Sequence, residues 1–266
     1  MIAAVLVSDG AMRNRIADAL RGRATPRFFE SSVQFDRITR RDVPDCIITE
    51  LSDVSGKSRL SVIRAIHTRF PSRPIVACCH LEKNAFHLAV EAGRLGLSDV
   101  ILIGFDDVGG SIRSILERAE STRARHRVAS ALRRIMPAMP SVQEFVDRCL
   151  EVPPNPKHEP YAPTVNYIAG QSHISRRTLA ERFHRANVPS PHTVLAWVRL
   201  LVAGCLLKDP GRSIASIAHD AGFTSARALR RTMKQMTGLC PGDVREMGGF
   251  QCVLQAFRAD VHSLAA

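Results

Sequence analysis

Apolar runs of strand length alternate with helical stretches over residues 1–120. The runs that suit one buried strand each are residues 2–8, 26–30, 44–51, 74–79 and 100–104. Between and after them the apolar positions follow a helical period, most clearly in 12–22 and 111–120. Strands that are apolar throughout are typical of a parallel sheet with helices on both faces. The pattern therefore predicts an α/β domain with a parallel sheet over residues 1–120.

A long basic stretch, 114–137, continues the helical pattern beyond that domain. Its apolar positions form a broken stripe at Ile115, Ala119, Val128, Leu132 and Ile135. We expect a helical linker over residues 121–140, and the stripe leaves a dimer-forming coiled segment open. Pro137 and Pro140 end this helix. Ser141 and Glu144 have the spacing of a capping box that begins the next one.

From residue 141 onward the apolar period is helical, and the most informative segment is 213–245. Apolar residues recur there at the spacing of one buried helix face, at Ile214, Ile217, Ala218 and Ala221. Ser213 is placed to cap that helix, and Gly222 suits the left-handed turn that ends it. Thr224 or Ser225 caps the following helix, in which Leu229 and Met233 point inward.

The outer face of this following helix is cationic. Its members are Ser225, Ala226, Arg227, Arg230, Arg231 and Lys234. A short helix with a cationic outer face after a tight glycine turn is typical of a reader of the DNA major groove. The sequence therefore predicts an all-α domain over residues 141–247 with double-stranded DNA as its partner. Residues 248–266 form a C-terminal tail with a short apolar helix that packs back on this domain.

An upstream segment repeats the same arrangement. Ser175 is placed to cap a helix, Leu179 and Phe183 face inward, and the outer face carries Arg176, Arg177, Ala180 and Glu181. The helix between the two motifs has an apolar stripe at Val194, Trp197, Val198, Leu201 and Cys205. A rigid connector of this kind holds two recognition helices about one DNA turn apart, ~34 Å, in successive major grooves.

The two motifs resemble the double helix-turn-helix of the AraC/XylS family of transcription regulators, and the resemblance covers residues 141–247. The second motif matches at Ile214, Ile217-Ala218, Gly222-Phe223, Thr224-Ser225, Leu229, Arg231, Met233-Lys234, Gly238, Pro241 and Arg245. The first half matches at 175–183, Ser190-Pro191, Arg199-Leu200, Ala203 and Leu206-Leu207. The chain departs from the family at Ala228 and Val244, where aromatics are common, at Val188, where glycine is usual, and in a Pro-rich insertion from Pro153 to Pro163.

The resemblance implies which residues read bases. They are Arg177, Ala180 and Glu181 in the first recognition helix, and Ala226, Arg227, Arg230 and Arg231 in the second. Arginine bonds guanine O6 and N7 together, and glutamate accepts from cytosine N4. Each arginine remains equally open to a phosphate contact, and Glu181 to an ion pair with Arg177 or Arg185. The resemblance further implies a transcription activator that contacts RNA polymerase.

The order and spacing of elements in 1–120 resemble a response-regulator receiver domain. Working receivers hold Mg²⁺ beside an aspartate that accepts a phosphoryl group, with a hydroxyl and a lysine further on. Carried over, the acidic cluster reduces to Ser8-Asp9, the acceptor position holds Glu50, the hydroxyl position Cys79 and the lysine position Ile103.

We therefore expect a degenerate phosphoacceptor pocket of Asp9, Glu50 and Cys79. The domain is then a pseudo-receiver, with a flavodoxin-like sheet, that dimerises the protein or receives a signal. Two alternatives stay open. One is a phosphorylation-dependent two-component response regulator that uses Asp53 or Asp45. The other is a generic flavodoxin-like sensor or dimerisation domain.

Composition narrows the function classes. The net charge is +12, and residues 161–266 carry +7 of it, where the DNA motifs lie. No apolar run approaches ~18 residues, so no transmembrane helix and no membrane partner are expected. The dinucleotide, P-loop and nucleophile-elbow motifs do not occur, so we expect neither an enzyme nor a cofactor.

Cysteine and histidine usage points to a reducing compartment without a metal site. The seven cysteines lack any C-x-x-C spacing, and the ten histidines form no metal-binding pattern. Both observations fit the cytoplasm. A redox role for the adjacent Cys78-Cys79 pair is the remaining alternative, and a homodimer stays open.

Overall fold

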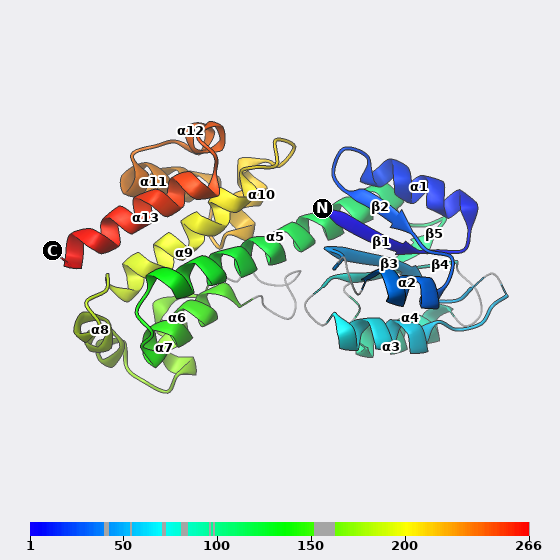
Figure 1. Ribbon diagram of the computed structural model, residues 1–266, viewed down its shortest axis with the longest axis horizontal. Coiled ribbons are helices and arrows are strands. Elements are labelled where there is room, and N and C mark those ends of the chain that lie inside the picture. The colour runs from blue at the N-terminus through cyan, green and yellow to red at the C-terminus, as the bar shows by residue number, and fades with distance from the viewer. Residues whose placement is uncertain are drawn as a thin grey trace. The chain divides into compact units, whose positions relative to one another are not determined.

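The computed structural model describes residues 1–39, 43–53, 55–70, 73–80, 85–95, 97, 99–151 and 163–265. The chain divides into two compact units, Met1–Thr122 and Arg123–Ala266 (Figure 1). The Pro-rich insertion expected from Pro153 lies outside the described residues as far as residue 162.

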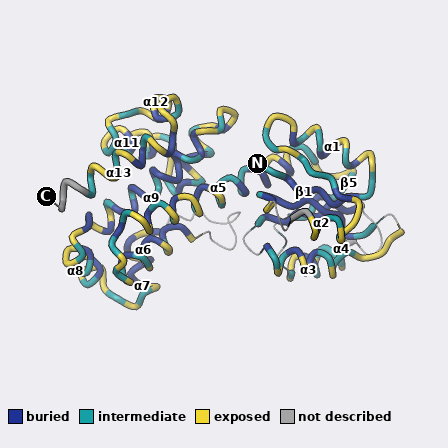
Figure 2. The backbone as a smooth tube through the Cα atoms, in the orientation of Figure 1, coloured by how far each residue is buried: buried dark blue, intermediate teal, exposed yellow. Residues whose placement is uncertain are grey.

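The first unit is built on five parallel strands. They are β1 (Ile2–Leu6), β2 (Thr25–Phe28), β3 (Cys46–Glu50), β4 (Ile75–His80) and β5 (Asp99–Ile103). Their order in the sheet is β2-β1-β3-β4-β5. The central strands are almost wholly buried (Figure 2), as their unbroken apolar runs predicted.

Helices cover both faces of this sheet. One face carries α1 (Gly10–Leu20) and the first half of α5 (Val108–Ile135), and the other carries α2 (Ser32–Thr39), α3 (Leu60–Arg69) and α4 (Ala85–Arg94). This strand order with helices on two faces is the flavodoxin-like arrangement, so the predicted fold class is confirmed. The strand order reverses between β1 and β3, whose carboxyl ends therefore lie beside a crevice.

Helix α5 begins in the first unit and ends in the second. Its residues Ile115 and Ala119 belong to the core of the sheet, whereas Val128 and Leu132 belong to the core of the C-terminal unit. The apolar stripe predicted from the sequence is thus buried within this chain. It is not available as the seam of a dimer-forming coil, so that interpretation is wrong.

The second unit is all-α, as predicted. Besides the end of α5 it contains α6 (Pro140–Leu150), α7 (Val165–Gln171), α8 (Arg176–Arg185), α9 (Pro191–Leu206), α10 (Ile214–Asp220), α11 (Ala226–Thr237), α12 (Pro241–Glu246) and α13 (Phe250–Ala265). In the part of the chain that the structure describes, no helix combines the length and apolar character needed to cross a membrane.

Helix α9 is buried on nearly every side, more completely than the single stripe predicted. Its buried residues are Pro191, Val194, Leu195, Trp197, Val198, Leu200, Leu201, Val202, Ala203, Gly204 and Leu206. It packs against α6, α7, α8, α10, α11 and α13. The helix is therefore the centre of the C-terminal core.

The start of α6 differs from the prediction. The helix begins at Pro140, and Met139 stands at the N-cap without a side-chain hydrogen bond. Proline suits the first helical position because it lacks an N–H that would be unpaired there. The capping box of Ser141 and Glu144 is therefore wrong. The Glu144 carboxylate instead accepts a hydrogen bond from Ser172 Oγ at 2.8 Å.

The C-terminal tail is an integral part of the second unit. Helix α13 is 16 residues long and packs along α9. The Phe257 and Trp197 rings meet edge to face with centroids 5.6 Å apart, and Trp197 Nε1 donates to Asp260 Oδ2 at 2.7 Å. The short apolar helix predicted from the sequence thus extends from Phe250 to Ala265.

We expect Phe257→Ala to lower the free energy of unfolding of the C-terminal unit by about 3–5 kcal/mol, because it leaves a cavity against α9. Gln255→Ala, on the exposed side of the same helix, should change it by less than about 0.5 kcal/mol. Trp197 is the single tryptophan of the chain, so its fluorescence during urea unfolding reports on this unit. Equal transition midpoints for the two variants would contradict the packing of α13.

Candidate nucleic-acid interface

Two helix-turn-helix motifs, α7–α8 and α10–α11, are joined by α9. A serine caps three of the four motif helices. Ser175 Oγ accepts the Thr178 N–H at 3.0 Å, Ser213 Oγ accepts the Ser216 N–H at 3.1 Å, and Ser225 Oγ accepts the Ala228 N–H at 3.1 Å. The predicted caps are confirmed, and Ser225 rather than Thr224 begins α11.

The turn within each motif needs a residue in the left-handed region. In the second motif this residue is Gly222, with φ of 81°, as predicted. In the first motif it is His173, with φ of 52°, a non-glycine residue that the sequence pattern did not identify. Gly238, with φ of 75°, ends α11 in the same way.

The outer face of α8 presents its predicted DNA contacts to solvent. Arg176, Arg177, Ala180 and Glu181 are all exposed. Arg177 Nε lies 3.0 Å from Glu181 Oε1, and their side chains are 90% and 48% exposed. An exposed pair one helical turn apart contributes little stability, so DNA can displace it at small cost. Of the two partners that the sequence left open for Glu181, the structure selects Arg177.

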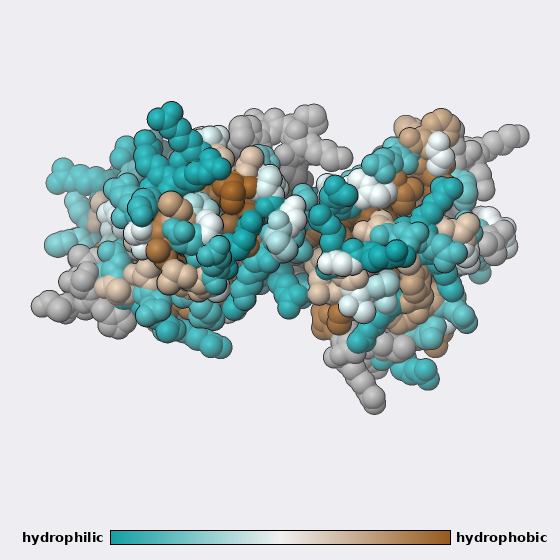
Figure 3. All heavy atoms as spheres, turned by 90° about the horizontal axis from the view of Figure 1, so that it is seen from above, coloured by the Kyte–Doolittle hydropathy of each residue, from teal (hydrophilic) through white to brown (hydrophobic). Residues whose placement is uncertain are grey.

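The outer face of α11 is exposed and cationic. Leu229 and Met233 are fully buried on its inner side. The outer side carries exposed Ser225, Arg227, Arg230, Arg231 and Lys234, with Ala226 half-buried. Within the described residues, none of these four cations has a carboxylate partner at ion-pair distance. Hydrophilic side chains surround a smaller hydrophobic area on the visible face of this unit (Figure 3).

A second group of predicted residues meets at the carboxyl ends of the strands in the first unit. A cavity of about 250 Å³ there is lined by Val7, Asp9, Met12, Glu50, Ser52, Asp53, Gly56, Cys78, Cys79, His80 and Ile103. The structure thus brings Asp9, Glu50 and Cys79 together, with Ile103 beside them. Sequence reasoning did not find His80.

Glu50 is buried and fully engaged. Its carboxylate accepts hydrogen bonds from the Ser8 N–H at 2.9 Å and from the Ser8 hydroxyl at 2.6 Å. Arg59 Nη2 lies 2.7 Å from Glu50 Oε1. The side chains of Arg59 and Glu50 are only 14% and 10% exposed. Both carboxylate oxygens therefore have partners. Sequence reasoning missed Arg59, which has no motif around it to mark it.

The other acidic residues considered for this unit have structural roles. Asp9 caps α1 by accepting the Ala11 N–H at 2.9 Å. Hydrogen bonds from the Ser55 side chain and the Lys57 backbone lower the pKa of Asp53. Asp45 precedes β3 at the amino end of the sheet and accepts the Ile2 N–H at 2.8 Å, so it lies away from the cavity. Among the residues described here, no three potential ligands gather as a metal site.

The adjacent cysteines lie on opposite faces of the sheet. Cys78 belongs to the core beneath α1 and α5, and Cys79 to the core beneath α3 and α4. Burial raises the pKa of the Cys78 thiol to about 12, so it is not a reactive thiolate near neutral pH. The geometry disfavours a disulfide between them, and the redox alternative loses its support.

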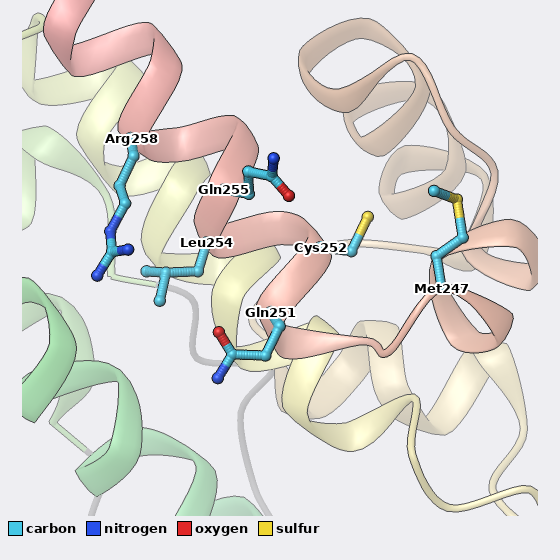
Figure 4. Close-up of a pocket in the computed structure, with 6 residues that line it drawn as sticks. All are labelled: Met247, Gln251, Cys252, Leu254, Gln255 and Arg258. Atoms are coloured by element: carbon cyan, nitrogen blue, oxygen red, sulfur yellow. The ribbon is translucent and has the colours of Figure 1, made fainter.

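A second hollow, of about 420 Å³, lies beside α13 (Figure 4). It is lined by Met247, Gln251, Cys252, Leu254, Gln255 and Arg258. All of these belong to α13 or the turn before it, and none of the predicted DNA contacts lies in it.

The second unit has the arrangement of a helix-turn-helix domain, with two such motifs on one buried connector, and residues 168–247 match the helix-turn-helix domain family. The chain is 36% identical over 83 residues to a putative AraC-like transcription regulator of Streptomyces lividans. It is 26% identical over 107 residues to the RCS-specific HTH-type transcriptional activator RclR of Escherichia coli. Residues 168–247 are therefore similar to the helix-turn-helix domains of AraC-like transcription regulators.

These matches are confined to part of each protein. They cover 31% and 40% of this chain, and 27% and 36% of the relatives, so the chain spans about a third of the length of the curated relatives it matches. In the first unit, the chain is similar to the receiver domain of NtrX from Brucella abortus, at 21% identity and a TM-score of 0.39 over 44% of this chain and 96% of that one. It is also similar to a response-regulator receiver domain from Bacteroides fragilis, at 16% identity and a TM-score of 0.39 over 44% and 95%.

Removal of the cap that begins α11 should destabilise the C-terminal unit. We expect Ser225→Ala to cost about 1 kcal/mol of unfolding free energy, because the Ala228 N–H loses its partner. Thr224→Ala, the matched control, removes a neighbouring exposed hydroxyl that does not cap the helix. Urea unfolding followed by Trp197 fluorescence measures both. A larger loss of unfolding free energy for Thr224→Ala than for Ser225→Ala would show that Ser225 is not the residue that caps α11.

Proposed function

We propose that this protein is a sequence-specific, DNA-binding transcription regulator that inserts α8 and α11 into successive major grooves. The observation that carries the proposal is the pair of serine-capped helices with exposed polar faces on either side of one buried connector. The excess positive charge of residues 161–266 supports it, because phosphate attraction supplies much of the affinity for DNA.

Base reading is assigned to the outer faces of the two helices. In α8 the readers are Arg177, Ala180 and Glu181, with Arg176 beside them. In α11 they are Ala226, Arg227, Arg230 and Arg231, with Ser225 and Lys234 at the two ends of the face. Guanine suits the arginines and cytosine suits Glu181. These residues fall within the proposed DNA-binding domain of 141–247.

The regulator acts as a cytoplasmic activator that contacts RNA polymerase. The Escherichia coli relative supports activation rather than repression, since that protein is described as a transcriptional activator. Dimerisation or signal reception is assigned to the receiver-like unit. That unit is a pseudo-receiver, because a glutamate already paired with Arg59 and Ser8 occupies the acceptor position.

We expect Arg231→Ala and Arg177→Ala each to weaken binding to the cognate sequence by about 1–3 kcal/mol and to relax specificity at one base pair. Arg134→Ala removes an exposed arginine of α5 outside both motifs and is the control. The test is competition binding on a duplex selected by the wild-type protein and on a scrambled duplex. Equal losses on the two duplexes would make the residues phosphate contacts.

A phosphorylated response regulator is the second candidate, because Asp53 lines the cavity beside Glu50. Under the pseudo-receiver proposal, a small phosphodonor with Mg²⁺ leaves the intact mass of the protein unchanged. Neither the engaged Glu50 nor the hydrogen-bonded Asp53 should accept the phosphoryl group. A stable acylphosphate that disappears in Asp53→Asn would overturn the pseudo-receiver assignment and favour the second candidate.

A further inference from the structure

The last residue of α10, Asp220, is held by two arginines from different parts of the C-terminal unit. Its carboxylate is paired with the guanidinium of Arg212, whose side chain is fully buried. Its backbone oxygen accepts a hydrogen bond from Arg125 Nη2 at 2.7 Å. Carbonyls in the last turn of a helix have no partner within the helix, so a charged donor there is stabilising.

A third arginine fixes the segment before α10. Arg245, on α12, donates through Nε to the Leu207 backbone oxygen at 2.9 Å and through Nη2 to the Arg212 backbone oxygen at 3.2 Å. The connection between α9 and α10 is therefore held against α12. Arg125 contacts Asp220 from the N-terminal side of the domain.

Helix α10 is one of the elements that position the second recognition helix, which also packs against α9 and α13. Only the turn around Gly222 separates Asp220 from Ser225, which caps α11. A displacement of Asp220 is thus passed to α11 over five residues of chain. By contrast, α8 lies in the other motif and is positioned by α6, α7 and α9.

Arg125 lies on α5, which belongs to both cores. About three turns of that helix earlier, Ile112 and Ile115 pack against the sheet whose carboxyl edge carries the Glu50 cavity. Two residues after Arg125, the Arg127 guanidinium lies over the Phe250 ring at 4.4 Å. Burial lowers the pKa of Arg125, which marks the energetic cost of placing this cation here.

We propose that Arg125 is a positioning residue through which α5 sets the second recognition helix, so that the state of the receiver-like unit alters the reading of the second half-site. The inference rests on the proposed DNA-binding function. It assigns control to α11 and leaves α8 independent of the receiver-like unit.

The direct test compares Arg125→Gln with the matched control Arg134→Gln in the full-length chain. Each protein is titrated with the selected duplex, and with duplexes in which either the first or the second half-motif is scrambled. Discrimination at a half-motif is the ratio of the affinity for the selected duplex to the affinity for the duplex with that half-motif scrambled. Arg125→Gln should lower this ratio about tenfold for the second half-motif and change it by less than about twofold for the first. Arg134→Gln should change neither, and Arg125→Lys should recover part of the loss because it keeps a charged donor.

The route along α5 is tested with a double-mutant cycle. Glu50→Gln disturbs the cavity, and Arg59→Gln breaks the same ion pair from the other side. In the wild-type background, either change should alter discrimination at the second half-motif. In the Arg125→Gln background, neither change should alter that discrimination further. An identical effect in both backgrounds, or no effect in the wild type, would contradict the proposed route.

The outcomes separate the inference from the function on which it rests. If the wild-type protein selects no sequence, the proposed function fails and takes the inference with it. If the wild type discriminates at both half-motifs and Arg125→Gln does the same, only the inference fails. Loss of discrimination at both half-motifs by a variant that still melts cooperatively would likewise contradict a role confined to α11.

Discussion

The burial of α9 is the constraint on which the C-terminal unit depends. A helix that is apolar on nearly all sides must be surrounded, and α6, α10, α11 and α13 supply the surroundings. Because both motifs pack against the same helix, the outer faces of α8 and α11 are held by one core. The proposed reading of DNA by both helices would then require little ordering on binding, which favours affinity.

The N-terminal unit depends on a different constraint, because it buries a carboxylate. An ionised side chain at 10% exposure is tolerable only when it is paired and hydrogen-bonded, and Glu50 meets both conditions through Arg59 and Ser8. Arg59 and Ser8, which stabilise the buried carboxylate, also occupy the Glu50 oxygens that phosphoryl transfer would need. Stability and the proposed loss of phosphorylation therefore have one physical cause.

The sequence predicted what depends on local periodicity and turn chemistry. It gave the parallel sheet, the two motifs, the caps at Ser175, Ser213 and Ser225, and the turn at Gly222. It did not predict pairs that meet only in the fold, such as Arg125 with Asp220. The start of α6 was wrong because a proline at the first helical position outweighed the capping box. The dimer-forming coil was wrong because an apolar stripe does not reveal whether its partner is another chain or this one.

Selection of random duplex DNA by the full-length protein, with a salt titration of the enriched pool, tests the central claim most directly. A reader with two recognition helices on one rigid connector should enrich two short half-motifs about 10 bp apart, with binding that persists above the salt-sensitive background. Uniform binding that disappears with salt and enriches no sequence would contradict the account of α8 and α11 as base readers.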